Sequence, residues 1–297
     1  MSTTRTQRKQ RSLWFEAWRR LKKNKLAMAG LLFLALLVVI AISTIIIDIA
    51  TNKSYYNDHV IKQNLRLRLQ GPSKDHIFGL DEFGRDIFLR MLWAVRYSLF
   101  MGTIAIAMST IVGGILGAIA GFYGKRTDNI IMRFMDILLA IPSMLLATAI
   151  VAALGTSLTN VLMAIAISYI PTFARTVRAS VLTIKDQEFI EAARALGASD
   201  LRIIGKYILP NSLAPLIVQA SLGVAGAILS IAGLSFLGLG IQPPTPEWGS
   251  MLSNARSYIR DGWHITVIPG LGIMLTILAL NVLGDGLRDA LDPRLKN

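Results

Sequence analysis

Cysteine is absent from this chain of 297 residues. Its absence excludes a disulfide framework, a thiolate zinc site and a cysteine nucleophile. Histidine is scarce, and we interpret His59, His76 and His264, which are scattered through the predicted outer loops, as surface residues rather than metal ligands. No metal site is predicted.

A phosphate-binding loop is also missing. The nearest phrase, GFYGKR at residues 121–126, lacks the G-x-x-x-x-G-K-[ST] spacing that cradles phosphates. No serine has a base placed beside it by the sequence pattern. We therefore predict no catalytic residue and no cofactor, and the chain is not expected to be an enzyme.

Charged residues are few for a chain of this length. They make up 16% of the residues, against 53% hydrophobic residues and a mean hydropathy of +0.53. Such a composition is typical of a polytopic membrane protein. The formal net charge of +13 must be compared with membrane topology before nucleic acid is considered as a partner.

Residues 1–25 form a basic flank with nine Lys or Arg and one acid, Glu16. Apolar residues alternate with these charges, which predicts an amphipathic helix at the membrane surface. Leu26 to Ile47 is a run of 22 uncharged residues, longer than the core of a signal peptide and without a small-residue cleavage site after it. We expect a retained first span.

Four further uncharged runs predict the remaining spans. Residues 97–124 are rich in glycine and predict a second span that packs closely inside a bundle. Residues 137–174 are nearly twice the length of one crossing, so GTSLTN at residues 155–160 should divide them into a third and a fourth span. Residues 207–246 are assigned one crossing, and a sixth span is expected at about residues 265–284.

The resulting prediction is an all-α membrane protein with six transmembrane helices and both termini in the cytoplasm. It places 21 Lys and Arg on the cytoplasmic side and 10 outside. This bias follows the positive-inside rule and explains most of the basicity without nucleic acid. Few polar residues fall inside the spans, which argues against a proton-coupled carrier and leaves the substrate-binding residues unknown.

Residues 186–211, DQEFIEAARALGASDLRIIGKYILPN, are the longest charged stretch after residue 136. Phe189, Ala193 and Leu196 have the spacing of an apolar helical stripe, and Gly197 can end that helix in a left-handed conformation. Ser199 or Asp200 can then cap a second short helix, whose apolar positions are Leu201, Ile204 and Ile208. We expect a helix, an elbow and a helix outside the membrane, a unit suited to transmit force to a docked partner.

A second charged segment, HIFGLDEFGRDIF at residues 76–88, contains Asp81, Glu82, Arg85 and Asp86 between or beside Gly79 and Gly84. Neither paired histidines nor the spacing of a calcium loop is present. We therefore interpret it as a charged turn that packs on the outer ends of the helices.

These segments carry a family resemblance. The first resembles the EAA loop of permease subunits of ATP-binding-cassette importers, with the pattern E-A-A, three residues, G, nine residues, I, any residue, L-P. Its matching positions are Glu191, Ala192, Ala193, Gly197, Leu209 and Pro210, and Tyr207 stands where the family usually has isoleucine. The turn at residues 79–86 is similar to the G-T-D-x-x-G-R-D segment of the dipeptide, oligopeptide and nickel branch, with Leu80 in place of threonine. QPPTPEWG and the tail GDGLRDALDPRLKN also resemble this branch.

The resemblance implies a type I ABC importer permease fold in a bacterial plasma (inner) membrane. It implies a second permease subunit, two cytoplasmic ATP-binding subunits and an extracellular or periplasmic substrate-binding protein as partners, with the lipid bilayer around them. Residues 1–96 would hold the basic flank, the first helix and an external segment. Residues 97–297 would hold a five-helix core with the coupling loop at residues 186–210.

Several alternatives remain open on the sequence. The same architecture would serve import of nickel or glutathione in place of peptides. A self-sufficient secondary carrier or channel would contain acids inside the membrane and would need no ATPase subunits. A scaffolding membrane subunit would tolerate changes in the loop at residues 186–210.

Overall fold

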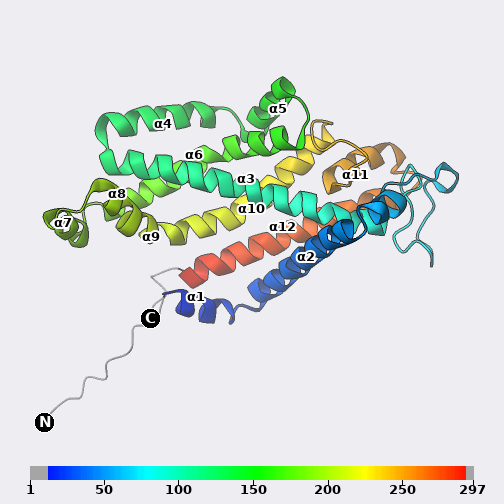
Figure 1. Cartoon of the computed structure of the whole chain (residues 1–297), viewed down its shortest axis with the longest axis horizontal. Helices are drawn as coiled ribbons and strands as arrows, with labels where there is room; N and C mark the ends of the chain where they lie inside the picture. The colour runs from blue at the N-terminus through cyan, green and yellow to red at the C-terminus, as the bar shows by residue number, and fades with distance from the viewer. Residues whose placement is uncertain (1–12, 292–297) are drawn as a thin grey trace, which may run out of the picture.

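The computed structural model describes residues 13–291 as an elongated bundle of helices (Figure 1). Within that range there is no β-strand, only an isolated bridge between Leu80 and Asp86. The long helices are α2 (Lys25–Ala50), α3 (Ile87–Tyr123), α6 (Leu158–Ile184), α10 (Leu213–Phe236) and α12 (Trp263–Leu291). The shorter helical elements are α1 (Leu13–Leu21), η1 (Tyr56–Val60), η2 (Leu65–Leu67), α4 (Lys125–Ala140), α5 (Ser143–Leu154), α7 (Glu188–Ala195), α8 (Asp200–Ile203), η3 (Ile204–Ile208), α9 (Leu209–Asn211), α11 (Trp248–Ala255) and η4 (Arg256–Tyr258).

The first predicted span is confirmed by α2, which is long and apolar enough to cross a membrane. The Asn24 side chain accepts a hydrogen bond from the Ala27 amide at 3.1 Å and so caps the helix at its start. One face of α2 is buried at intervals of three to four residues, and that face packs on α12 and α3. The basic residues of the flank at positions 5–11 lie outside the described residues.

The second span, α3, begins ten residues earlier than the predicted residue 97. The first turns of α3 contain Arg90 and Arg96, and because of these charges the sequence analysis did not include the turns in the span. Arg90 and Arg96 instead find partners at the outer end of the bundle, where Arg96 pairs with Asp48 of α2 at 2.6 Å. Because these charges are paired locally, they do not end the helix.

The predicted close packing of the glycine-rich span is confirmed by its contacts with α6. A Cβ atom on Gly117 would lie 2.2 Å from the Ala174 carbonyl oxygen, and one on Gly113 would lie 2.6 Å from the Ile170 oxygen. Only glycine allows the two backbones to approach so closely, as is common between membrane helices.

The predicted third span is not one straight helix. Helices α4 and α5 meet at a bend of 85° around Pro142, and the residue before this proline, Ile141, has the extended conformation that a proline imposes. At 1.5 Å per residue, the 12 residues of α5 reach about 18 Å, short of a bilayer core of about 30 Å. The turn at residues 155–160 is confirmed, because Ser157 caps α6 by accepting a hydrogen bond from the Asn160 amide at 3.1 Å.

The segment between residues 207 and 246 contains one span-length helix, α10, as predicted. The short helix α11 follows it and lies against α10 and α12 at one end of the bundle (Figure 1). The last span, α12, extends beyond the predicted residues 265–284 at both ends.

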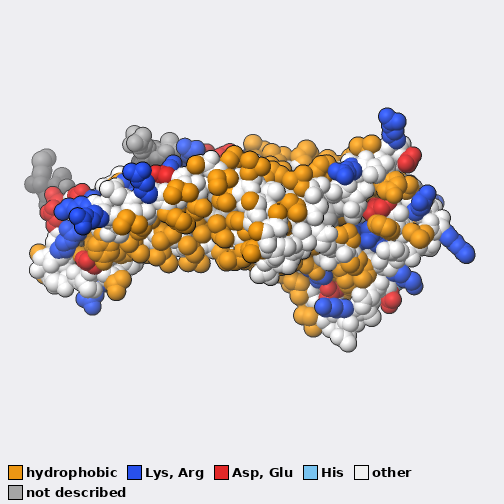
Figure 2. Space-filling model, turned by 90° about the horizontal axis from the view of Figure 1, so that it is seen from above, with side chains coloured by type: hydrophobic (Ala, Val, Ile, Leu, Met, Phe, Trp, Pro, Cys, Tyr) orange, Lys and Arg blue, Asp and Glu red, His pale blue; other side chains and the backbone are white. Residues whose placement is uncertain are grey.

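The two ends of the bundle carry different segments. The start of α1, the helices α7 to α9 and the C-terminal end of α12 lie at one end, and α11 lies with residues 51–86 at the other (Figure 1). Figure 2 shows that most of the charged side chains on this face gather at the two ends of the bundle. A broad apolar band lies between them. A belt of this kind fits a membrane-embedded protein.

Candidate functional site

The loop predicted to couple to a partner forms a folded unit at the end of α6. Gln187 precedes α7, and its side-chain amide donates a hydrogen bond to the Thr183 carbonyl at 3.2 Å, which ties the start of α7 to the last turns of α6. Glu188 and Glu191 lie in the first turn of α7 and Arg194 in its last, an order that complements the helix dipole.

Gly197 ends α7 in the left-handed conformation that the sequence predicted, with φ at +79°. The Ala198 amide donates to the Ala193 carbonyl at 3.0 Å, and the Gly197 amide donates to the Arg194 carbonyl at 2.9 Å. This pair of bonds is a Schellman motif, which satisfies carbonyls that a helix end leaves open. A Cβ on Gly197 would meet no atom within 4 Å, so the backbone conformation, and not lack of space, is what requires glycine here.

The apolar stripe predicted for α7 is wrong in two of its three positions. Ile190 and Ala193 are the buried residues of α7, whereas Phe189 is 40% exposed and Leu196 is 88% exposed. The helix is only eight residues long, and Leu196 at its C-cap lies past the surface that Ile190 and Ala193 cover. Glu191, Arg194 and Ala195 are exposed.

The second short helix differs from its prediction in one of three apolar positions, because Leu201 is exposed whereas Ile204 and Ile208 are buried. Leu201 is 81% exposed, and Ile203, Ile204 and Ile208 are the buried residues. Residues 204–208 form a π-helical turn, which is wider than an α-helical turn and places residues five apart on the same face. Ser199 is the N-cap of α8 but makes no capping hydrogen bond through its side chain.

The buried face of this unit belongs to the largest apolar core of the bundle. Ile190, Ala193 and Ile203 share that core with Val181 and Ile184 of α6. Two ring contacts add to it: the Arg194 guanidinium lies 5.4 Å from the centre of the Phe122 ring at the end of α3, and the Phe189 and Tyr207 rings lie 6.4 Å apart. The unit is therefore packed against the ends of two spans, which favours movement together with them.

The motif residues divide between two faces. Ala193 is buried, Tyr207 and Leu209 are partly buried, and Glu191, Ala192, Gly197 and Pro210 are exposed. Tyr207, at the position where the motif usually has isoleucine, packs its ring against the core and keeps an apolar contact. The exposed side combines Glu191 with Leu196 and Leu201, two large apolar side chains whose exposure is unusual at the end of a bundle where charges gather.

The inner half of α6 is fixed to α4 by two ion pairs. Arg178 binds Asp128 with both Nε and Nη2, at 2.5 and 2.6 Å, and Arg175 binds Asp136 at 2.5 Å. The bidentate pair also restricts the orientation of the Arg178 side chain. The bent helix α4 is thereby linked to the span that leads into α7.

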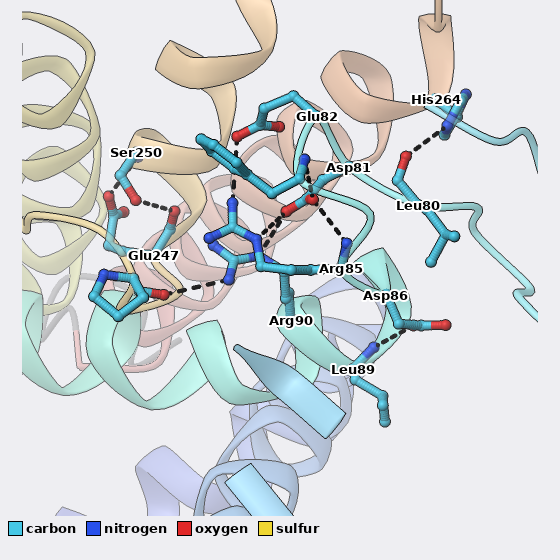
Figure 3. Close-up of polar contacts among 12 residues, drawn as sticks. Leu80, Asp81, Glu82, Arg85, Asp86, Leu89, Arg90, Glu247, Ser250 and His264 are labelled. Atoms are coloured by element: carbon cyan, nitrogen blue, oxygen red, sulfur yellow. Dashed lines mark hydrogen bonds and ion pairs between the residues drawn. The ribbon is translucent and has the colours of Figure 1, made fainter. Parts of the chain in front are cut away.

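The charged turn at the other end of the bundle is built around the Asp81 carboxylate (Figure 3). Its Oδ1 accepts hydrogen bonds from the Phe83 and Arg85 amides at 2.9 Å, and its Oδ2 accepts one from Arg85 Nε at 2.6 Å. The same Oδ2 lies 3.3 Å from Arg90 Nε in an ion pair. Both arginines are almost fully buried, so one carboxylate compensates two buried positive charges.

Glu82 supplies a second, weaker negative charge to this cluster. Its Oε1 accepts a hydrogen bond from Arg85 Nη2 at 3.3 Å. Burial, followed by the neighbouring Asp81 carboxylate, raises the pKa of Glu82 above its ordinary value, and the two arginines only partly oppose this rise.

Residues far apart in the sequence complete this outer cluster. Arg90 Nη1 donates to the Pro244 carbonyl at 3.3 Å, within the QPPTPEWG segment. Glu247 of the same segment is buried and caps α11 by accepting hydrogen bonds from the Gly249 and Ser250 amides, both at 2.8 Å. Residues 76–88 thus form the expected charged turn against helix ends, at the end of the bundle that carries α11. The sequence pattern did not reveal that Arg90 and the QPPTPEWG segment belong to it.

One histidine prediction is wrong. His264 is 2% exposed, and its Nε2 lies 3.3 Å from the Leu80 carbonyl oxygen, against the turn (Figure 3). Its position at the start of α12, next to the buried turn, explains its burial. His59 is exposed as predicted, and His76 is half-buried with its Nδ1 2.8 Å from Asp86 Oδ2.

Residues 113–297 match the family described as "Binding-protein-dependent transport system inner membrane component", and residues 12–72 match "N-terminal TM domain of oligopeptide transport permease C". The chain belongs to the binding-protein-dependent transport permeases. Membership of this family implies partner ATPase and substrate-binding subunits.

The chain is similar in sequence to permeases named for peptide or glutathione transport. The chain is 51% identical over 286 residues to the dipeptide transport system permease protein DppC of Alkalihalophilus pseudofirmus, covering 96% of this chain and 91% of that protein. It is 46% identical over 282 residues to the di/tripeptide transport system permease protein DppC of Pseudomonas aeruginosa, covering 95% and 92%. It is also 46% identical over 286 residues to the glutathione transport system permease protein GsiD of Escherichia coli, covering 96% and 92%.

A solved structure shares the fold. A chain from inward-facing conformations of the MetNI methionine ABC transporter matches this permease with a TM-score of 0.56 at 19% sequence identity, covering 68% of this chain and 96% of that chain. The predicted all-α, type I ABC importer permease fold is confirmed by this similarity and by the span-length helices.

Proposed function

We propose that this permease imports di- or oligopeptides across a bacterial plasma membrane as one of two permease subunits of an ATP-driven transporter. Two relatives named for dipeptide or di/tripeptide transport support the substrate class. Two cytoplasmic ATP-binding subunits and an external substrate-binding protein would complete the assembly. Residues 1–96 would form the flank, first span and external segment, and residues 97–297 the core.

The unit at residues 186–210 is, in this proposal, the coupling element that docks into an ATP-binding subunit. The observation that carries the proposal is its two-faced construction. One face, with Ile190 and Ile203, is buried in the core that contains the end of α6, and the other exposes Glu191, Leu196 and Leu201. A partner bound to the exposed face would move α6 through the buried one, because a close-packed core transmits displacement with little compression.

Glutathione import is a second candidate, because a glutathione permease is 46% identical to this chain. Glutathione is itself a tripeptide, so the two substrates differ in size and charge more than in chemical class.

Uptake competition tests the substrate class. Cells lacking this permease and complemented with it would be given a radiolabelled dipeptide in the presence of excess unlabelled dipeptide, glutathione or Ni²⁺. We expect the unlabelled dipeptide to abolish labelled uptake and Ni²⁺ to leave it unchanged. Stronger competition by glutathione than by the dipeptide would favour the second candidate, and complemented cells without dipeptide uptake would contradict the proposal.

A further inference from the structure

A hollow in the apolar surface lies between α2 and α12, near the end of the bundle that carries α7. It has a volume of about 200 Å³ and is lined only by apolar residues. Its walls are Leu26, Ala29 and Phe33 on α2 and Leu275, Leu278 and Val282 on α12. Figure 1 shows the two helices running side by side along this part of the bundle.

Two small residues form the floor of this groove. A Cβ on Gly30 would lie 2.8 Å from the Ala279 carbonyl oxygen, so the backbones of α2 and α12 are nearly in contact there. Leu26, Leu275 and Leu278 rise on either side and are substantially exposed. The groove therefore exists because small residues sit between large ones, and it opens toward the surroundings of the apolar band.

The end of the groove at Leu26, here called its mouth, follows a run of basic residues. Leu26 is preceded by Lys22, Lys23 and Lys25, all exposed, and Arg19 of α1 is exposed as well. Leu21 and Ala27 pack against Gly286 of α12, which fixes α1 beside the last turns of α12. Two exposed acids on those turns, Asp285 and Asp289, offset part of this charge, and the four cations outnumber them.

We propose that this groove and its basic mouth are a binding site for an anionic phospholipid. An acyl chain would occupy the apolar groove, and the phosphate-containing headgroup would lie against the lysines at residues 22–25. Basic pockets at the ends of membrane helices recognise anionic headgroups, and buried methylene groups add to the binding of the chain. Trp18, which is exposed and lies under the Lys22 ammonium at 5.1 Å, belongs at the same interfacial level.

The charge pattern favours a lipid over a helix of a partner subunit. An apolar groove beside a cluster of exposed cations matches the two parts of an anionic phospholipid, its acyl chain and its headgroup. A membrane-spanning helix of a partner subunit needs no negative charge at this position.

Native mass spectrometry of the full-length chain in detergent tests the site. Phosphatidylglycerol and phosphatidylcholine with identical acyl chains would be titrated separately. We expect tighter retention of phosphatidylglycerol, and each lysine near an anionic headgroup contributes about fivefold in affinity. Lys22→Gln, Lys23→Gln and Lys25→Gln combined should therefore lower the apparent affinity for phosphatidylglycerol at least tenfold. Equal retention of the two lipids by the wild type would overturn the proposal.

Matched variants separate the groove from the general surface. Ala29→Phe fills the groove and should reduce phosphatidylglycerol binding, whereas Ala35→Phe places the same side chain elsewhere on the exposed surface of α2 and should not. Arg66→Gln, Arg68→Gln and Lys74→Gln combined, at the opposite end of the bundle, should also bind like the wild type. Unchanged binding in Ala29→Phe, or an equal loss in the control variants, would contradict the site.

A cross-linking measurement distinguishes lipid from a protein occupant without disturbing the fold. Because the chain has no cysteine, Ala29→Cys introduces a single thiol into the groove. A photoactivatable label on this thiol, in the transporter purified with its co-isolating subunits, should capture phospholipid. Capture of a second protein chain in place of lipid would show that the groove is a subunit interface and overturn the proposal.

Discussion

Glu191 lies on the exposed face of α7, and its side chain has no ion-pair or hydrogen-bond partner within residues 13–291. Glu191 stabilises α7 only through its place in the first turn, where a negative charge interacts favourably with the helix dipole. This interaction contributes about 0.3–1 kcal/mol. If its function is to contact an ATP-binding subunit, Glu191→Lys should leave folding intact and weaken that attachment. Pull-down of the ATP-binding subunits with the variant chain is expected to fall severalfold. Glu188→Lys, in the same turn, is the matched control, and an equal loss in both would indicate only general charge repulsion.

Asp81, in contrast to Glu191, is buried, and both of its carboxylate oxygens accept hydrogen bonds. Asp81→Asn would remove the carboxylate that pairs with both Arg85 and Arg90, and removing one partner of a buried pair costs about 3–5 kcal/mol. We expect a lower thermal midpoint in detergent and less protein in the membrane, with Asp75→Asn, at an exposed position of the same segment, unchanged. A wild-type midpoint for Asp81→Asn would show that the cluster does not stabilise the outer end.

Glu82 gives the same cluster a pH dependence. Its pKa is raised in the folded chain, so the folded state binds a proton there more tightly than the unfolded chain does. Its contribution to stability should therefore increase as the pH falls through the folded-state pKa toward the ordinary value. The thermal midpoint would be measured from neutral pH down to about pH 5. On acidification, the midpoint of Glu82→Gln should rise less, or fall more, than the midpoint of the wild type. Parallel curves for the two proteins would refute this contribution.

At the scale of elements, the closest packing in the bundle is that between α3 and α6. Gly117→Val would place its branched side chain against the Ala174 carbonyl, where a single Cβ already comes within 2.2 Å. Overpacking of this kind costs about 1–3 kcal/mol or more and should separate the two helices. Gly270→Val, in α12, adds the same side chain where no atom lies within 4 Å of the new Cβ and is the control. Thermal unfolding followed by circular dichroism should show the loss in Gly117→Val only.

The elements also show which parts of the fold a sequence pattern can predict. Long uncharged runs predicted the positions of α2, α6, α10 and α12, because hydrophobic length alone decides a crossing. The early start of α3 was not predictable, because it depends on Asp48 and Asp81, which pair with its arginines from other segments. The bend between α4 and α5 lies at Pro142 inside an apolar run, where hydropathy gives no signal.

The candidate site was predictable in its backbone and less so in its faces. Gly197 could be assigned a left-handed conformation from its place after an apolar helix. The buried positions were predicted only in part: Ala193, Ile204 and Ile208 are buried as expected, but eight residues are too few to define a stripe, and the π-helical turn at residues 204–208 changes the spacing. As a result, Leu196 and Leu201 were assigned to the interior and in fact form the exposed surface.

At the scale of the whole molecule, the two ends of the bundle should face opposite sides of the membrane. Reporter tags at Thr3 and Lys296 should both be cytoplasmic, and tags at Asn64 and Ser157 should be external, because the charge bias places the basic end inside. An external tag at Lys296 would contradict the single crossing by α10.

Residues 186–210 are proposed to transmit nucleotide-driven motion to the spans, and Gly197→Val is the variant that tests this role. A β-branched residue in the left-handed conformation costs about 1–2 kcal/mol and should redirect α8 without unfolding the bundle. Gly205→Val is the matched control, because Gly205 has a negative φ and open space for a Cβ. ATP hydrolysis and peptide uptake would be measured on the same proteoliposomes that contain the assembled transporter. We expect Gly197→Val to retain the ATP-binding subunits and to hydrolyse ATP, while peptide uptake per ATP hydrolysed falls at least tenfold. Gly205→Val should be close to the wild type. An unchanged ratio of uptake to hydrolysis in Gly197→Val would contradict it.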